Sequence, residues 1–184
     1  MRAKELIGRL TRGDQVTLLE SIVVPEVGKA LQQWVKNAPK DQDWLLIGGT
    51  VVGFYTRPRA TMDVDVLFKG ENLPQDIIGF KKNRPHAYLH KDTHVEVEAL
   101  TPDYLKLPIA VVNKVFDTSV EINNVNIPSA EGLVALKLHR QNLQDLADIQ
   151  AIAMKHKIDL SDWPIDPNLI SRAESKIDMT LTSR

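Results

Sequence analysis

Residues 45–67 read LLIGGTVVGFYTRPRATMDVDVL, and the elements predicted from them set the rest of the fold. The apolar run that starts at Trp44 ends at Gly48 and Gly49, which predicts a short buried strand and a glycine turn. TVVGFYT then predicts a short helix, and RPRAT predicts a loop because Pro58 lacks an amide donor. MDVDVLF alternates between apolar and acidic residues and predicts a second strand.

The glycine turn has the composition of a phosphate-binding loop. Gly48 and Gly49 allow backbone amides to approach a ligand closely, and the N-terminus of the following helix favours an anion. The alternative is a tight turn between strand and helix that binds nothing. The sequence matches neither the Walker A loop nor the dinucleotide-binding fingerprint.

The second strand places two carboxylates side by side. Asp63 and Asp65 are two residues apart and share one face of the strand, while Met62, Val64 and Val66 are expected to face the core. Two like charges this close repel, and a divalent cation removes the repulsion. Carboxylate oxygens suit magnesium or manganese. The alternative is the solvated outer face of an edge strand.

A third acidic element strengthens the metal hypothesis. In THVEVEAL, Glu96 and Glu98 share one face of a predicted strand and the valines share the other. If this strand lies beside the strand of Asp63, a glutamate completes a cluster of three carboxylates facing the glycine turn. Such a cluster is the setting of two-metal phosphoryl transfer.

The remaining pattern predicts an α+β fold with a small twisted mixed sheet flanked by helices. Helices are expected over residues 2–37, 73–82, from Ser129 onward and near 168–175, and hairpins over 87–100 and 115–128. We expect one compact domain in three segments: an N-terminal helical segment (1–40), a catalytic core (41–128) and a C-terminal helical segment (129–184).

Composition narrows the possible functions and locations. The 184 residues carry a formal net charge of −1, which argues against a protein that coats nucleic acid, and DNA is not an expected partner. There is no cysteine, so disulfides and cysteine-based zinc sites are excluded. The sequence shows no signal-peptide pattern and no apolar run near the roughly 20 residues that span a bilayer. We expect a cytoplasmic protein without a membrane partner.

Together these motifs resemble the DNA polymerase beta-like nucleotidyltransferase superfamily, and most of all its minimal nucleotidyltransferases and abortive-infection nucleotidyltransferase toxins. The similarity covers residues 44–152. It rests on an apolar-Gly-Gly-Thr segment followed by Asp-apolar-Asp in an R-x-T-x-D-x-D context, and on a helical segment with Lys, Arg and two Asp. The matching residues are Arg59, Thr61, Asp63 and Asp65, and then Lys137, Arg140, Asp145 and Asp148.

The resemblance implies a role for each matching residue. Gly48, Gly49 and Thr50 would hold the triphosphate, and Asp63 and Asp65 would bind two Mg²⁺ or Mn²⁺ ions. Glu98, with Glu96 as its rival, would bind one ion and help to deprotonate the acceptor. The nucleotide-binding set is Gly48, Gly49, Thr50, Arg59 and Lys137.

Several of these residues have structural alternatives. Arg57 and Arg59 either neutralise phosphate charge or belong to a surface loop or an ion pair. Lys137 either reaches the nucleotide or acceptor or lies on a solvated helix face. Asp145 and Asp148 fit structural partners better than metal ligands. The sequence also departs from the family pattern, which usually has Asp in place of Glu98 and often Lys in place of Gln144.

The expected activity is metal-dependent transfer of a nucleoside monophosphate from a triphosphate to an acceptor hydroxyl, with release of pyrophosphate. The toxin-like resemblance favours an RNA 3′ end, such as that of tRNA, or a protein as acceptor, and an antitoxin as partner. The alternatives are a small-molecule nucleotidyltransferase of the antibiotic-modifying kind, and an inactive module of the same fold that binds nucleotides or proteins.

Overall fold

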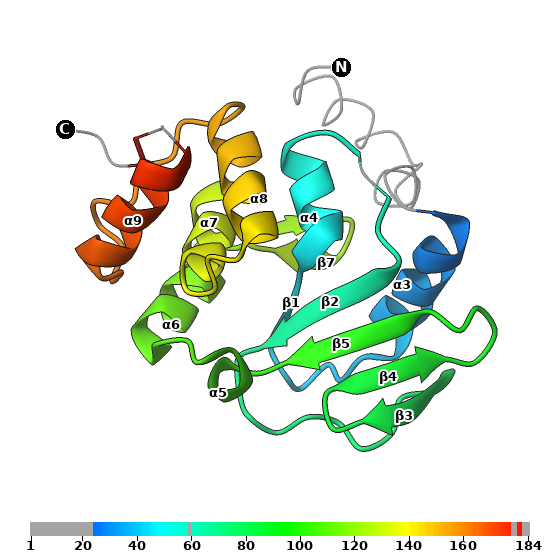
Figure 1. Ribbon diagram of the computed structural model, residues 1–184. Coiled ribbons are helices and arrows are strands. Elements are labelled where there is room, and N and C mark those ends of the chain that lie inside the picture. Colours follow the sequence, from blue (N-terminus) through cyan, green and yellow to red (C-terminus); the bar gives the residue numbers. More distant parts are fainter. Residues whose placement is uncertain (1–23, 59, 178–179, 182–184) are drawn as a thin grey trace.

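A computed structural model describes residues 24–58, 60–177, 180 and 181 of the chain. Figure 1 shows a sheet with helices on both of its faces. The sheet contains β1 (Trp44–Ile47), β2 (Asp63–Phe68), β3 (Phe80–Arg84), β4 (Ala87–His90) and β5 (Glu96–Leu100), in the order β1-β2-β5-β4-β3. The β2–β5 pair is parallel and the other pairs are antiparallel. The predicted α+β fold with a mixed sheet is confirmed.

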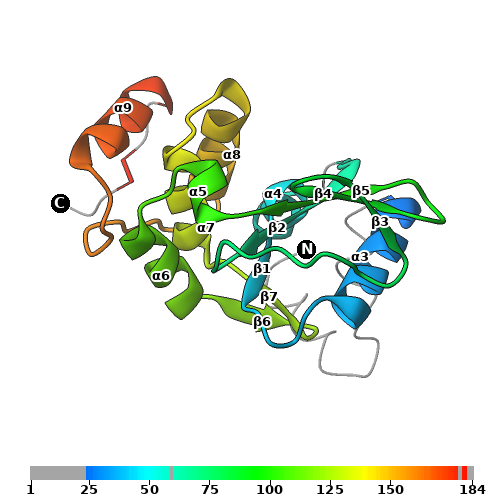
Figure 2. The same ribbon diagram turned by 90° about the horizontal axis from the view of Figure 1, so that it is seen from below.

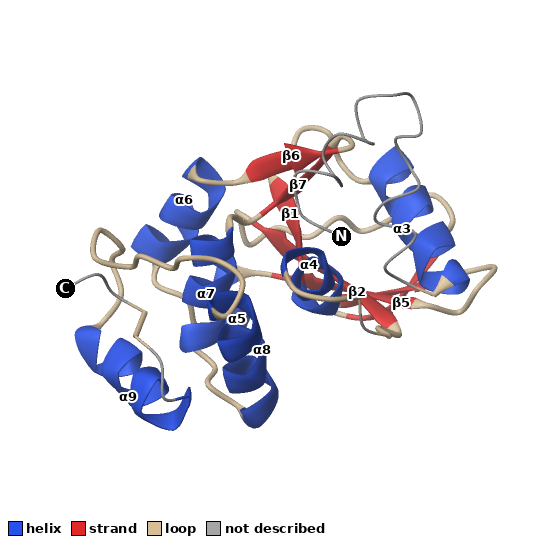
Figure 3. Cartoon of the chain, turned by 90° about the horizontal axis from the view of Figure 1, so that it is seen from above, coloured by secondary structure: helices blue, strands red, loops and turns tan. Residues whose placement is uncertain are grey.

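Helices complete the fold around this sheet. They are α3 (Pro25–Asn37), α4 (Gly48–Tyr55), α5 (Pro102–Leu105), α6 (Ile109–Asp117), α7 (Ala130–Leu138), α8 (Leu143–Ala153) and α9 (Pro167–Ile177). Figure 3 shows α3 apart from the group formed by α7, α8 and α9, with α4 between them. No helix in the described ranges is long and apolar enough to cross a membrane.

One face of the sheet forms an aromatic core with α3. The ring of Trp34, which is fully buried, makes edge-to-face contacts with Trp44, Phe68, Phe80 and Tyr88 at centroid distances of 5.5–6.4 Å. Val64, Val66 and Val97 are also fully buried. The alternating valines of β2 and β5 therefore support the carboxylates from behind.

Two predicted local features are confirmed. The short hairpin of β6 (Val120–Ile122) and β7 (Val125–Ile127) lies beside β1 (Figure 2), and Asn123 and Asn124 make its turn with φ of 54° and 61°. Asparagine tolerates this left-handed conformation better than most residues. Ser129 caps α7 by accepting a hydrogen bond of 3.0 Å from the amide of Gly132.

Two local predictions are wrong. The helix expected over residues 73–82 is an irregular segment that leads into β3 at Phe80. Gly79 has φ of +89°, which interrupts a helix, and Lys81 and Lys82 pair with β4 instead. Met62 does not face the core but is 76% exposed, because β2 begins only at Asp63.

The N-terminal part of the helical region expected over 2–37 lies outside the described residues. Its C-terminal part, from Pro25 to Asn37, forms α3. The division into segments 1–40, 41–128 and 129–184 stays a prediction. Buried apolar side chains from α3 to Leu181 form one continuous core cluster.

We expect Trp34→Ala to lower the free energy of unfolding by about 3–5 kcal/mol, because it leaves a cavity among four aromatic rings. Urea unfolding followed by circular dichroism measures this loss. Leu143→Ala, at a side chain that is 88% exposed, is the control and should change stability by less than about 0.5 kcal/mol. Equal losses in the two variants would contradict the role of Trp34.

Candidate active site

The glycine turn lies directly against the second aspartate of β2. Antiparallel pairing of β1 with β2 places Ile47 opposite Asp65, and the chain then turns into α4 at Gly48. Gly48 has φ of +72°, and a Cβ built on it would stand 1.8 Å from Oδ2 of Asp65. Only glycine fits here, both in conformation and in space. The backbone of the turn and the carboxylate of Asp65 are therefore in van der Waals contact.

The parallel register of β2 and β5 gathers the four predicted carboxylates. Asp63 is paired with Glu96, and Asp65 with Glu98. Paired residues of neighbouring strands point to the same face, so all four side chains stand on the face opposite the aromatic core. Glu98 is thus the glutamate beside Asp65, and Glu96 is the glutamate beside Asp63.

Asp65 is electrostatically the most perturbed member of this group. Burial, and then the negative charges of Asp63 and Glu98, raise the pKa of Asp65 to about 7. The positive charges of Arg140 and Lys137 oppose this rise in the pKa. A strongly perturbed carboxyl group between other charged groups is typical of a functional site.

The two glutamates share one cation. The guanidinium of Arg84 forms an ion pair with Glu96, and its Nη2 lies 3.7 Å from Oε1 of Glu98. Glu96 also accepts a long hydrogen bond of 3.5 Å from Asn83. Asp63 is exposed and accepts a hydrogen bond of 2.9 Å from the hydroxyl of Thr61.

Lys137 belongs to an ion-pair network between α7 and α8. Its Nζ lies 3.2 Å from Oδ1 of Asp145 and 2.8 Å from Oδ2 of Asp148, and its side chain is 11% exposed. Arg140 approaches Asp145 at 3.3 Å, and Gln144 donates a hydrogen bond of 2.9 Å to Asp148. The alternative of a solvated helix face is wrong for Lys137. Asp145 and Asp148 act as structural partners of the two cations, as expected.

Two further residues of the predicted nucleotide-binding set, Gly49 and Thr50, follow Gly48 directly. Gly49 and Thr50 are in the first turn of α4, whose preceding residue, Ile47, provides no side-chain cap. Thr50 is buried, at 3% exposure. Arg57 is exposed. Arg59 lies outside the described residues.

The carboxylates fit a divalent cation by residue type and by register, since hard oxygen ligands from Asp63, Asp65 and Glu98 share one face. In their present rotamers, however, no three His, Cys, Asp or Glu side chains of residues 24–58, 60–177 and 180–181 are grouped so that they could hold a metal ion. Arg84 stands near Glu98 on the side away from Asp65. Binding of an ion by all three therefore requires their side chains to move.

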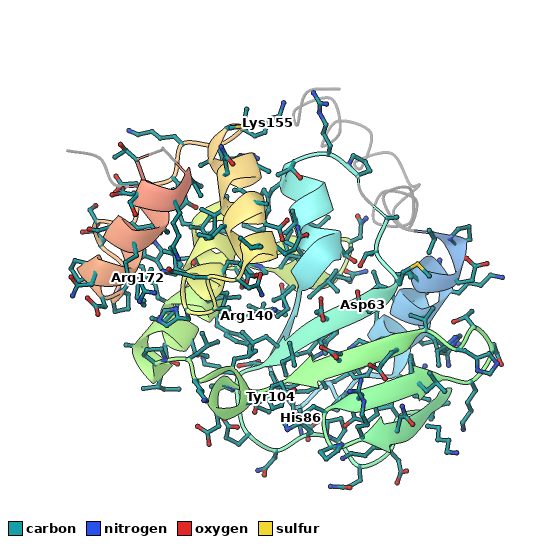
Figure 4. All side chains as sticks on the ribbon, viewed as in Figure 1. Asp63, His86, Tyr104, Arg140, Lys155 and Arg172 are labelled. Carbon is teal, nitrogen blue, oxygen red and sulfur yellow. The ribbon has the colours of Figure 1, made fainter. Side chains whose placement is uncertain are left out.

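The sequence did not reveal Arg84 or the aromatic pair of His86 and Tyr104. Figure 4 shows His86 and Tyr104 next to each other by the strand ends, with Asp63 on β2 and Arg140 on the helical side. The two rings are 4.3 Å apart, and Tyr104 is 58% exposed. The only signal was the basic run in FKKNRPH, which was assigned partly to a helix that does not form.

Comparison with known proteins supports the fold. No family model matches the chain, and no curated protein matches it in sequence. Several solved chains match in structure, and one of them is similar over 93% of this chain and 95% of its own, with a TM-score of 0.50 and 15% sequence identity. It is the crystal structure of an antigenic nucleotidyltransferase-like protein from Paracoccidioides brasiliensis. At this identity the likeness shows a nucleotidyltransferase-like fold.

We expect Gly48→Ala to destabilise the protein strongly, because the new methyl group collides with Asp65 and the φ of +72° is strained for alanine. The loss should reach about 2 kcal/mol or more, measured by thermal or urea unfolding. Gly70→Ala is the matched control, since no heavy atom beyond its chain neighbours lies within 4 Å of a Cβ at that position. Similar stability of the two variants would contradict the close packing of the turn on Asp65.

We expect Asp65→Asn to stabilise the metal-free protein at alkaline pH. Because the pKa of Asp65 is raised to about 7 in the folded state, ionisation of this carboxyl opposes folding, and the cost grows as the pH rises from about 4 to above 7. In EDTA, the free energy of unfolding of the variant should equal that of the wild type at about pH 4. At about pH 8 it should be higher than that of the wild type by on the order of a few kcal/mol. Urea unfolding at each pH measures the difference.

Asp63→Asn is the control on the same strand, because Asp63 is exposed and contributes only part of the repulsion. Its gain in stability should be smaller. A gain for Asp65→Asn that is equal at both pH values, or absent at the higher one, would show that the charge of Asp65 carries no such cost.

Proposed function

We propose that this protein is a metal-dependent nucleotidyltransferase that moves a nucleoside monophosphate from a triphosphate to an acceptor hydroxyl and releases pyrophosphate. One observation carries the proposal: the parallel register pairs Asp65 with Glu98 while the glycine turn packs on Asp65. The register thus puts Asp63, Asp65 and Glu98 on one face of the sheet, with the start of α4 against Asp65. The nucleotidyltransferase-like fold of the solved neighbour agrees with it.

Each element has a role in this proposal. Divalent ions such as Mg²⁺ or Mn²⁺, two in the related enzymes, would neutralise phosphate charge and lower the pKa of the attacking hydroxyl. Asp63, Asp65 and Glu98 would hold them. The amides at the start of α4, from Gly48 to Thr50, would donate hydrogen bonds to triphosphate oxygens. Catalysis then consists of positioning and charge stabilisation, without a covalent protein intermediate.

The helical side of the site would contribute positive potential. Lys137 and Arg140 both act on the charge of Asp65, and their own ion pairs with Asp145 and Asp148 hold them in place. A cation that is held by buried partners loses little further freedom when an anion binds. We therefore assign Lys137 and Arg140 to the stabilisation of the nucleotide phosphates from the α7–α8 side, and retain Arg59 as a further nucleotide contact.

The acceptor is proposed from the resemblance to minimal nucleotidyltransferases and toxins. It is an RNA 3′ end or a protein hydroxyl, and an antitoxin is the corresponding partner. Incubation of the protein with labelled triphosphates and cell extract distinguishes the classes: label in tRNA or in protein supports the toxin-like activity. Label confined to small molecules would replace it by an antibiotic-type transferase.

We expect Asp63→Asn to reduce transfer from α-³²P-labelled ATP, GTP, CTP or UTP at least about 100-fold, because a ligand of the proposed ions is lost. EDTA should abolish transfer by the wild type, and Mg²⁺ or Mn²⁺ should restore it. Asp117→Asn, at an exposed aspartate that ends α6, is the matched control and should retain activity.

Calorimetric titration with each triphosphate in Mg²⁺ tests binding separately from turnover. Triphosphate binding without transfer to any fraction of the extract would favour an inactive nucleotide-binding module. If no triphosphate binds, and Asp63→Asn leaves the calorimetric signal unchanged, the enzyme proposal is wrong. A protein-interaction module of the same fold then remains.

A further inference from the structure

Arg84 reaches the carboxylates across a neighbouring strand. It ends β3, the last strand of the sheet order, and an irregularity between Lys82 and Arg84 shifts it opposite Ala87. Ala87 is in turn opposite Glu98, and Glu98 is opposite Asp65. Arg84, Ala87, Glu98 and Asp65 therefore form one row across four strands.

The small side chain in this row makes the contact possible. Ala87 is 2% exposed and ends at its methyl group, so the long side chain of Arg84 passes over it to the glutamates of β5. A larger residue at that position would stand between Arg84 and Glu98. The row thus connects the outermost strand of the sheet with the candidate metal ligands.

Arg84 and a metal ion would compete for the carboxylate of Glu98. The guanidinium lies near Glu98 from the β4 side, whereas Asp65 is on the β2 side. An ion held by Asp65 and Glu98 would bring a second positive charge close to the guanidinium of Arg84, and the two positive charges would repel each other. Arg84 has a second and closer partner in Glu96, to which it can remain bound.

We propose that Arg84 is an internal counter-cation that neutralises Glu98 in the metal-free protein. Its contact with Glu98 breaks when a divalent ion binds between Asp65 and Glu98. This inference rests on the proposed function only in assigning the ion to these carboxylates. It makes Arg84 a positioning residue that acts through Glu98. It also divides the two glutamates: Glu96 is the permanent anchor of Arg84, and Glu98 is the exchangeable ligand.

The exchange predicts that removal of the guanidinium strengthens metal binding. An exposed ion pair contributes up to about 1 kcal/mol, which corresponds to roughly a fivefold change in affinity. In calorimetric titration of the full chain with Mn²⁺, without nucleotide, Arg84→Gln should bind about two- to fivefold more tightly than the wild type. Arg84 is 58% exposed, so the variant should fold, and circular dichroism checks this.

Lys81→Gln is the matched control, because Lys81 is an exposed cation on the same strand that forms no ion pair with Glu96 or Glu98 among the described residues. Its Mn²⁺ affinity should stay within about twofold of the wild type. The inference is overturned if Arg84→Gln binds Mn²⁺ no more tightly than the wild type, if Lys81→Gln shows the same gain, or if neither the wild type nor Arg84→Gln binds Mn²⁺.

A second measurement observes the exchange directly. The Nε–H signal of Arg84, identified by its loss in Arg84→Gln, should shift in ¹⁵N NMR spectra when the wild type is saturated with Mg²⁺. An unchanged signal at saturation would overturn the exchange. These readouts are separate from transfer: a protein with the exchange but no transfer rejects the proposed function, and transfer with unaltered Mn²⁺ affinity in Arg84→Gln rejects the exchange.

Discussion

Repulsion among the carboxylates of β2 and β5 is the constraint on which the arrangement of this molecule depends. Parallel pairing brings Asp63 beside Glu96 and Asp65 beside Glu98 on one face, and all of them except Asp63 are partly buried. Like charges directly opposite each other destabilise a sheet. The structure places cations from two separate regions around them: Lys137 and Arg140 on the helical side, and Arg84 on the sheet edge.

The opposite face of the same strands offsets this repulsion. Val64, Val66 and Val97 are fully buried there, and the packing of Trp34 against four aromatic rings fixes α3 on that face. Strand register cannot slip by one residue, since a slip would turn the valines to the acidic side and the carboxylates into the core. The energy that holds the carboxylates together therefore comes from the hydrophobic face behind them.

How much of this the sequence predicts depends on the range of the interactions. The period-two alternation in MDVDVLF and THVEVEAL is local, so it predicts both strands and the residues that share a face. The contact of Gly48 with Asp65 follows once β1 and β2 pair. The failed helix over 73–82 shows the limit, because pairing of Lys81 and Lys82 with β4 outweighed a local helical pattern.

The roles of Lys137 and Arg84 depend on packing between elements, which no local pattern contains. Helical spacing alone does not decide whether Lys137 reaches a ligand or lies on a solvated face, and only the approach of α8 puts Asp145 and Asp148 around its ammonium group. Arg84 reaches Glu98 across β4 only because Ala87 is small and the β3 register shifts beside it. The pairing of both cations with carboxylates depends on the strand order and the helix packing, and it cannot be predicted without them.

Gln144 stands where the nucleotidyltransferases that this sequence resembles often have Lys, and the charges around it are balanced without a lysine there. Gln144 donates a hydrogen bond to Asp148, while Lys137 and Arg140 face Asp145 and Asp148, so this cluster holds two cations and two anions. A lysine in place of Gln144 would add a third cation to the same buried pair of carboxylates. The amide instead orients Asp148 without adding charge. Lys137 therefore stays tightly held, and the positive potential that reaches Asp65 comes from residues whose positions are fixed by α8.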